Sequence, residues 1–267
     1  MKTVFSKIMA AALCLLAAGV QAGEVRERFE KNCPLSPGGS FSLENTNGAI
    51  EIVAWDRNEV QIVAQKLAQA RRQEDAQKLL AATEIIVRQE EYAVAVETRT
   101  PRVQDDDDTF WRWIFGEGNG SVTVTYQISL PRQIQIKIQS VNGQIEARAI
   151  SGNIRLATTN GSIAIDDARG SISAKTTNGR LRIAMAQVER EATLDFETTN
   201  GSITVEFPGD CNASISARTT NGRVDCDFPL TRRSGLRRNE LHGQIGEDGG
   251  RVNLRTTNGA ITILKRS

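Results

Sequence analysis

The residues that could carry out catalysis are few and lie far apart in the sequence. His242 is the single histidine among 267 residues, and we expect it at the surface of an irregular segment. The chain contains no His-Glu-x-x-His, no Gly-x-Ser-x-Gly and no phosphate-binding loop, which are the motifs of zinc proteases, serine hydrolases and nucleotide-binding enzymes. The sequence therefore predicts a protein that is not an enzyme, and it indicates no cofactor.

One run of carboxylates could bind calcium. It consists of Asp105, Asp106, Asp107 and Asp108. Calcium prefers several oxygen ligands, but the run lacks the alternating spacing and the glycine of a calcium-binding loop. Adjacent like charges repel one another and usually lie in solvated segments. No metal site is therefore predicted, and these four residues remain weak candidates.

A second acidic set predicts an alternative function. Glu206, Asp225 and Asp227 fall at outward positions of neighbouring repeats, where they could form an acidic face. Such a face, with calcium, would suit an enzyme that acts on polysaccharides. Because alternating strands always place polar residues outward, a solvated charged face is the favoured interpretation.

An aromatic segment is the strongest candidate for a binding element. It comprises Phe110, Trp111, Arg112, Trp113 and Phe115, inside an expected loop at 102–121. Tryptophan and arginine dominate interaction hot spots, and aromatic faces also stack on sugars. The alternative is that these side chains cover an open end of the fold, which would otherwise expose strand edges.

The amino-terminal 22 residues read as a secretory signal peptide. Two lysines precede an apolar run of 13 residues, Ile8 to Val20, and Val-Gln-Ala precedes an expected cleavage after Ala22. Cys14 raises a lipoprotein signal as the alternative, but Leu13 stands where a small residue is needed. Cleavage leaves 31 basic and 32 acidic residues, a balance that argues against nucleic-acid binding. We expect an exported protein of the periplasm or cell surface, without a transmembrane segment in the mature chain.

Export permits disulfides, and three cysteines remain after cleavage. Cys211 and Cys226 are 15 residues apart in consecutive repeats, which makes them the favoured pair, with Cys33 left over. The alternative is that both are small buried residues that happen to be cysteine.

The sequence Thr-Thr-Asn-Gly occurs five times and indicates a repeat architecture. Apolar residues alternate with polar ones on both sides of each motif, as in strands with one buried face. Gly143, Gly152, Gly161, Gly170 and Gly179 follow one another at intervals of nine residues. Two corners in a period near 20 residues predict a parallel β-solenoid of two-strand coils, in preference to an antiparallel sandwich.

The Asn-Gly pairs are the expected corners, because both residues tolerate turn conformations. The corner residues are Asn47, Gly48, Asn142, Gly143, Asn160, Gly161, Asn178, Gly179, Asn200, Gly201, Asn221, Gly222, Asn258 and Gly259. Stacked coils would let asparagine side chains bridge neighbours. They would also bring Lys175, Glu197 and Arg218 into a ladder of alternating charge.

The fold class expected is all-β, with two regions behind the signal peptide. Residues 23–135 are expected to form a β-rich capping region with one short helix at about 70–83. Residues 136–267 are expected to form the solenoid repeats, with an irregular insertion at 229–250.

Three features of the sequence are Thr-Asn-Gly followed by alternating aliphatic residues, the segment "SLENTNGAIEIVAWDRNEVQIVAQK" and the strand "YQISLP". In these features the chain resembles a bacterial family whose members are named putative adhesins of unknown function. The resemblance covers most of residues 36–264. It implies an exported β-repeat domain at the cell envelope and no catalytic residues.

These observations together predict an adhesin-like interaction scaffold that binds an envelope polymer or a protein partner, with self-association as a further possibility. A part in envelope-stress signalling is the third alternative, in which the scaffold would report to a membrane protein.

Overall fold

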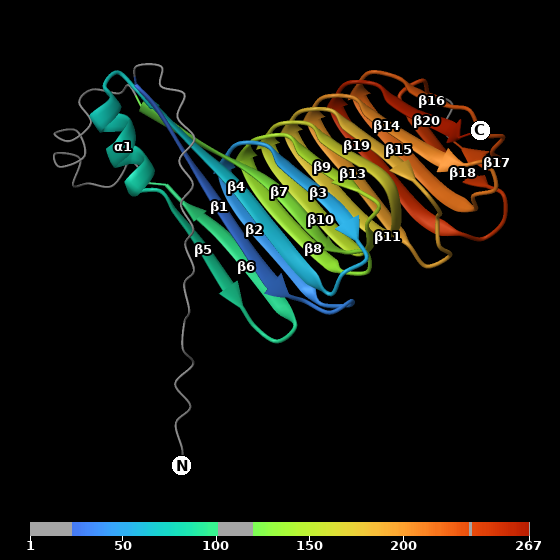
Figure 1. Ribbon diagram of the computed structural model, residues 1–267. Coiled ribbons are helices and arrows are strands. Elements are labelled where there is room, and N and C mark those ends of the chain that lie inside the picture. Colours follow the sequence, from blue (N-terminus) through green and yellow to red (C-terminus); the bar gives the residue numbers. More distant parts are fainter. Residues whose placement is uncertain (1–22, 101–119, 235–236, 267) are drawn as a thin grey trace, which may run out of the picture.

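The computed structural model describes residues 23–100, 120–234 and 237–266, without the side chains of 232–234. Over these ranges the chain forms two long β-sheets whose strands stack along one axis, with a single helix at one end (Figure 1). The long strand β11 (Ile163–Asn178) contributes to both sheets, so they are joined in the middle. The predicted all-β fold is confirmed.

Sheet A begins with three antiparallel strands and continues as a parallel stack. Its order is β1 (Glu24–Pro34), β4 (Glu59–Ala70), β7 (Gly120–Pro131), β3 (Ile50–Trp55), β9 (Ile145–Arg148), the first half of β11, β12 (Leu181–Met185), β14 (Ile203–Pro208), β20 (Ile261–Arg266) and β16 (Val224–Cys226). From β7 onward, all neighbouring strands are parallel.

Sheet B is parallel except near its two ends. Its order is β5 (Glu84–Gln89), β6 (Ala93–Arg99), β2 (Ser40–Asn47), β8 (Gln135–Asn142), β10 (Ser151–Asn160), the second half of β11, β13 (Thr193–Asn200), β19 (Gly250–Asn258), β15 (Ala213–Asn221), β18 (Glu240–Ile245) and β17 (Thr231–Ser234). Each coil is one strand of sheet B, an Asn-Gly corner and one strand of sheet A, so the predicted parallel solenoid of two-strand coils is confirmed.

The coils do not stack in the order of the sequence. The last coil in the chain, β19–β20, lies between β13–β14 and β15–β16, because β19 pairs with both β13 and β15. β20 in the same way pairs with both β14 and β16. The coils β13–β14 and β15–β16 follow one another in the sequence. In the stack, the later coil β19–β20 separates them.

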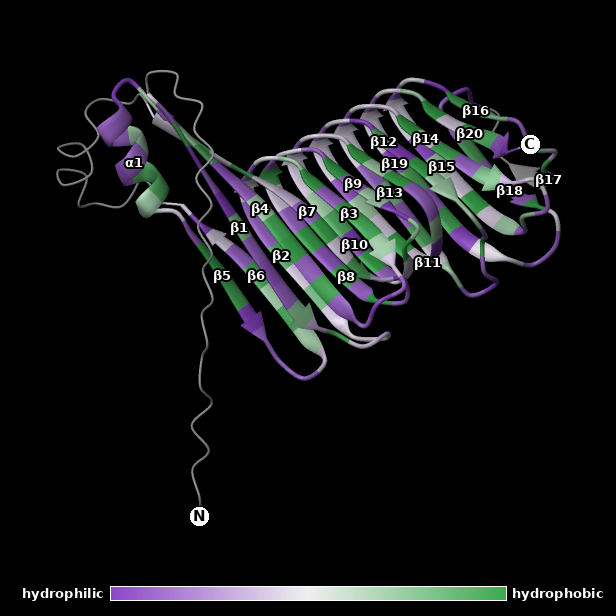
Figure 2. Cartoon of the chain, viewed as in Figure 1, coloured by the Kyte–Doolittle hydropathy of each residue, from purple (hydrophilic) through white to green (hydrophobic). Residues whose placement is uncertain are grey.

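The core is the layer between the two sheets, and alternation along each strand fills it (Figure 2). One row across sheet B consists of Phe41, Ile136, Ile154, Ile172, Leu194, Val252 and Ile215, each at most 2% exposed. Burying each such side chain contributes about 1.5–3 kcal/mol. Since no coil can bury its apolar side chains alone, stacking stabilises all of them together.

The amino-terminal end differs from the expected boundaries. The helix α1 spans Gln73–Ala81 rather than 70–83, because Ala70 still belongs to β4. Its buried residues Ala76 and Leu80 lie on one face, and the helix packs against β4, β1 and β7. The coil β2–β3 is already in register with β8–β9, so the solenoid begins at Ser40 and extends into the region expected as its cap.

The segment expected as an irregular insertion at 229–250 is partly regular. It supplies β18, which pairs antiparallel with β15, and β17, which pairs with β18. His242 accordingly lies in a strand, with its Nε2 3.0 Å from Glu240 Oε1. Antiparallel strands thus extend sheet B at both ends of the parallel stack.

Candidate binding surface

The seven Asn-Gly corners lie in one line along the stack. Six side-chain hydrogen bonds, each of 2.8 Å, join Asn47, Asn142, Asn160, Asn178, Asn200, Asn258 and Asn221 in that order. In every bond the Nδ2 of one asparagine donates to the Oδ1 of the preceding one in this order. The register of the parallel strands places these residues side by side, so one repeated residue forms a continuous ladder.

The coils approach each other most closely at the corner glycines. A Cβ added to Gly179 would lie 1.9 Å from the carbonyl oxygen of Gly161. Glycine is therefore required at this position by the packing of backbone on backbone. The same close approach recurs at Gly201, whose added Cβ would lie 1.8 Å from the oxygen of Gly179.

The first threonine of each Thr-Thr-Asn-Gly motif forms a second, buried ladder. Thr158, Thr176, Thr198, Thr256 and Thr219 each donate from Oγ1 to the corner glycine carbonyl of the neighbouring coil, over 2.9–3.3 Å. The second threonine of each motif is exposed: Thr159, Thr177, Thr199, Thr257 and Thr220. We call this exposed threonine row, together with the asparagine ladder, the corner ridge.

The charge ladder expected beside the ridge is only partly present. Lys175 Nζ lies 2.9 Å from Glu197 Oε2, and this pairing raises the pKa of Lys175. Glu197 is in register with Arg255 rather than with Arg218, because β19 lies between β13 and β15. The expected neighbour relation between Glu197 and Arg218 is therefore wrong.

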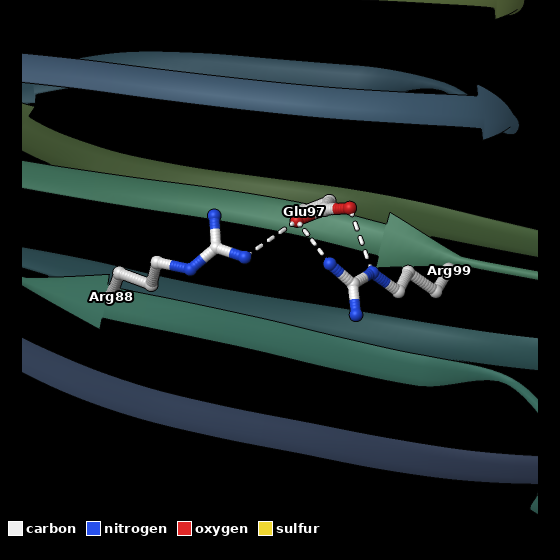
Figure 3. A network of polar contacts seen from close by, with 3 residues as sticks. All are labelled: Arg88, Glu97 and Arg99. Atoms are coloured by element: carbon white, nitrogen blue, oxygen red, sulfur yellow. Dashed lines mark hydrogen bonds and ion pairs between the residues drawn. The ribbon is translucent and has the colours of Figure 1, made fainter.

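A hollow of about 620 Å³ lies at the amino-terminal end of the ridge, on the outer face of sheet B. Its walls come from the ends of β2, β6 and β8. Glu97 in its wall accepts hydrogen bonds from Arg99 Nε at 2.8 Å and from Arg88 at 3.1 Å, as Figure 3 shows. These bonds, chiefly the one from Arg99, lower the pKa of Glu97, so the carboxylate stays ionised at neutral pH.

The core behind this hollow is held by a bond between the sheets. Thr98, which also lines the hollow, lies with its Oγ1 2.7 Å from the hydroxyl of Tyr126 on β7. Burial raises the pKa of Tyr126 to about 12, so the hydroxyl keeps its proton. The end of β6 is thereby fixed to sheet A.

A second hollow, of about 570 Å³, lies at the opposite end among the loops around Asn212, Gly246 and Asp248. Asn212 Oδ1 accepts a bond of 2.8 Å from the backbone nitrogen of Glu247, so its side chain holds a loop in place.

The aromatic binding element and the aspartate run both lie outside the described residues. This applies to Phe110, Trp111, Arg112, Trp113 and Phe115 and to Asp105, Asp106, Asp107 and Asp108. The expected loop at 102–121 does end earlier than predicted, because Gly120 and Ser121 belong to β7. Trp55 is described: its Nε1 donates to Glu59 O over 2.8 Å, and Arg57 lies 4.8 Å above its ring.

The acidic face expected from Glu206, Asp225 and Asp227 does not form. β20 lies between β14 and β16, and Glu206 is opposite Leu264 whereas Asp225 is opposite Thr262, so the two carboxylates are two strands apart and also offset by two residues along the strands. Asp225 instead pairs with Arg223 at 2.8 Å. Within the described ranges, histidine, cysteine and carboxylate side chains form no group of three that could hold a metal ion.

Cys211 and Cys226 are present as thiols in the structure, so the expected disulfide is not formed there. Burial is the main cause that raises the pKa of Cys211 to about 11, and Asp210 and Cys226 add to it. The two cysteines thus lie near enough for one to influence the other. Cys33 is buried at the opposite end of the stack, in β1.

The corner ladder, the alternating core and the two parallel sheets define a class of protein, the parallel β-solenoids built on Asn-Gly corners. Within this class the chain belongs to the family described as Toastrack DUF4097, which matches residues 113–264. The match covers more than half of the chain, and the resemblance expected from the repeats is confirmed.

Solved structures with low sequence identity to this chain come from several bacteria. One is a putative cell adhesion protein from Clostridium sporogenes, with 16% identity over 90% of this chain and 100% of that chain and a TM-score of 0.46. Another is a putative adhesin from Bacteroides fragilis, with 9% identity over 89% of this chain and 97% of that chain and a TM-score of 0.33. A comparison with curated proteins finds no match. In the part of the chain that the structure describes, no helix is long and apolar enough to cross a membrane.

Proposed function

We propose that this protein is an exported, non-enzymatic scaffold of the cell envelope that binds a linear envelope polymer along the corner ridge. The observation that carries the proposal is the regular spacing of the ridge. The same amide recurs at all seven corners and the same exposed hydroxyl at the five Thr-Thr-Asn-Gly coils, and parallel strands are about 4.8 Å apart. A partner that itself repeats can make the same weak contact many times over such a row.

Many weak contacts add up because each one holds the next in place. Once one unit of a polymer is bound, its neighbours bind as if at high local concentration, so affinity rises without a deep pocket. The ridge is also rigid, since every asparagine in it is hydrogen-bonded to its neighbours. Rigid groups lose little conformational entropy on binding. A protein partner with a matching repeat is the alternative occupant.

The binding test uses purified residues 23–267 and insoluble peptidoglycan, separated by sedimentation. We expect the parent protein to sediment with the polymer. The ridge variant Thr177→Lys/Thr199→Lys places two bulky charges on adjacent coils and should remain in solution. The matched control Thr204→Lys/Thr262→Lys makes the same change on adjacent strands of the outer face of sheet A and should sediment like the parent.

The outcomes separate the candidate surfaces. Equal sedimentation of both lysine variants would exclude the ridge, and Trp111→Ala/Trp113→Ala then tests the aromatic segment. If the parent protein itself stays in solution, the polymer-binding function is wrong. Export is tested separately, by amino-terminal sequencing of the protein from the periplasm or surface, where Gly23 is the expected first residue.

A further inference from the structure

The last asparagine of the corner ladder is held less firmly than the six before it. Asn221 ends the ladder because its coil, β15–β16, is the last parallel coil of the stack (Figure 1). Its Nδ2 donates to Asn258 Oδ1 over 2.8 Å. Among the described residues, however, no donor lies on Asn221 Oδ1, because no further corner follows. The side chain of Asn221 is therefore fixed at one end only.

The backbone amide that follows each ladder asparagine shows the same difference. Six of the corner glycines donate from their backbone nitrogen to the backbone oxygen of the next asparagine along the ladder, over 2.9–3.1 Å: Gly48, Gly143, Gly161, Gly179, Gly201 and Gly259. Gly222 has no next coil, and its nitrogen donates to none of the described residues. Of the seven corner glycines, all of which the structure describes, Gly222 alone is exposed.

These differences matter for a reaction that Asn-Gly pairs undergo in water. The backbone nitrogen after the asparagine loses its proton and attacks the carbonyl carbon of the side chain. A new carbon–nitrogen bond forms, the side-chain nitrogen takes up a proton and leaves as ammonia, and a five-membered succinimide ring remains. Water then opens this ring at either carbonyl group, which gives aspartate or isoaspartate. Glycine in the second position favours the attack because it has no side chain to shield the nitrogen.

Six of the seven corners are protected against this attack in two ways. Their glycine N–H is hydrogen-bonded between coils, so the nitrogen is closed to the base that would remove its proton. Their side-chain amide has to break two hydrogen bonds before it can turn toward that nitrogen, as Asn178 illustrates. Such a corner reacts only after the coils have opened locally. At Asn221, the nitrogen of Gly222 is exposed and a single side-chain bond has to break.

We propose that Asn221 is a site of spontaneous modification, which converts to aspartate or isoaspartate while the other six corners stay intact. The product carries a carboxylate, which has no N–H to donate at neutral pH. The bond to Asn258 Oδ1 is then lost, and two oxygen atoms face each other in its place. The reaction thus removes the last bond of the ladder and adds one negative charge to this end of the corner ridge. It goes beyond polymer binding and does not depend on it.

The test incubates purified residues 23–267 in the folded state at mildly alkaline pH and follows each corner by peptide mapping. Tandem mass spectrometry detects the replacement of the amide nitrogen by oxygen. Trypsin is unsuitable because it releases the same peptide, Thr-Thr-Asn-Gly-Arg, from 176–180 and from 219–223. Cleavage after glutamate places Asn178 in 147–189 and Asn221 in 207–240, so the two sites are measured separately. Asn119, which also precedes a glycine, lies outside the described residues and is followed as its own peptide.

We expect Asn221 to convert at least about tenfold faster than Asn178. One fewer side-chain hydrogen bond contributes about two- to tenfold, and the exposed nitrogen of Gly222 adds to this. The rate should rise with pH, because the attacking nitrogen has to lose its proton. The identical pentapeptides provide the matched control: in guanidinium, where the coils are unfolded, Asn178 and Asn221 should convert at nearly equal rates.

The variant Asn200→Ala separates the two causes of protection. It removes the donor to Asn178 Oδ1 and keeps the bond from Gly179 N to the backbone oxygen of residue 200. Asn178 should then convert about two- to tenfold faster than in the parent and still more slowly than Asn221. This result would show that the bonded glycine nitrogen protects the inner corners in addition to the ladder.

Two results would overturn the inference. One is an equal rate at Asn221 and Asn178 in the folded protein. The other is a folded protein in which Asn221 stays unchanged while the unfolded protein converts. Because the measurement is the mass of a peptide and involves no polymer, either result leaves the sedimentation test of the proposed function as it stands.

Discussion

At the scale of single residues, the corner motif assigns a separate task to each of its four positions. The first threonine donates a buried hydrogen bond to the preceding coil of the stack, the second faces solvent, the asparagine extends the outer ladder, and the glycine permits close approach. In the coil of Thr176 to Gly179 all four tasks are visible together. In the five coils that carry it, the motif recurs because each of them makes the same contacts to its neighbours.

Removing one asparagine from the middle of the ladder should cost stability. Asn178→Ala breaks two bonds of 2.8 Å, to Asn160 and from Asn200. We expect the free energy of unfolding to fall by roughly 1–2 kcal/mol, at about 0.5–1.5 kcal/mol per hydrogen bond, with partial compensation by water. Guanidinium denaturation followed by circular dichroism measures the shift in midpoint. The neighbouring exposed Thr177→Ala is the control and should change stability by less than about 0.5 kcal/mol; an equal shift for both would contradict a structural role of the ladder.

The residues of the ridge could be predicted from the sequence, whereas those of the hollow could not. Repeated Asn-Gly pairs at fixed spacing indicate stacked corners by themselves. Asn45 and Ser140 line the amino-terminal hollow and stand where later coils carry the first threonine of the motif. They look like ordinary departures from a repeat, and they lie 95 positions apart in the chain. Only the pairing of β2 with β8 brings these two residues side by side, and that pairing skips every strand from β3 to β7.

At the scale of the elements, the period of nine residues predicts the coils but not their order. Every corner carries nearly the same residues, so the ladder bonds would form equally well between any two coils. The position of β19–β20 between two earlier coils therefore depends on how the whole coil packs against both neighbours. The residues at the corners do not predict that position. The segment 229–250 looks irregular because it is rich in arginine and glycine, yet β18 forms there because the edge of β15 is available to pair.

The two cysteines near the carboxyl-terminal end of the stack give a prediction at this scale. We expect Cys211 and Cys226 to form a disulfide when the purified protein is treated with oxidised glutathione. Closing a loop of this length would stabilise the fold by about 3 kcal/mol. Because burial raises the pKa of Cys211 to about 11, little thiolate is present at neutral pH, so the reaction should be slow and should speed up as the pH is raised.

Mass spectrometry of the intact, non-reduced protein measures the loss of two hydrogen atoms. Cys33→Ser should leave this change in place, and Cys226→Ser should abolish it. Alkylation of all three thiols after prolonged oxidation and denaturation would show that the pair does not form.

At the scale of the whole molecule, the inserted coil joins two parts of the stack whose described strands do not pair with each other. β19 contacts β13 on one side and β15 on the other. The strands β15, β16, β17 and β18 are therefore connected to the rest of the sheets through β19 and β20. The stability of these four strands should therefore depend on the coil β19–β20.

A cavity in the inserted coil should consequently loosen its neighbours. Leu254 in β19 is fully buried, and Leu254→Ala should cost about 2–5 kcal/mol. Hydrogen exchange followed by mass spectrometry should show faster exchange in β15 and β18 as well as in β19. Leu241→Ala, in strand β18 near the end of sheet B, is the control and should leave β13 and β19 protected. Parent-like protection of β15 in Leu254→Ala would contradict this dependence.

The position of the inserted coil also sets a sequence of events in time. A chain that is synthesised from its amino terminus presents β15–β16 before β19–β20 exists. During that interval the edge of β13 that later pairs with β19 is unpaired. The coil β15–β16 stays unpaired as well, or it pairs with a non-native neighbour. The arrival of Gly250–Arg266 completes both contacts at once. The stack is thus completed when β19–β20, which is synthesised after β15–β16, inserts between the earlier coils. Until then, the order of synthesis leaves strand edges exposed to non-native pairing.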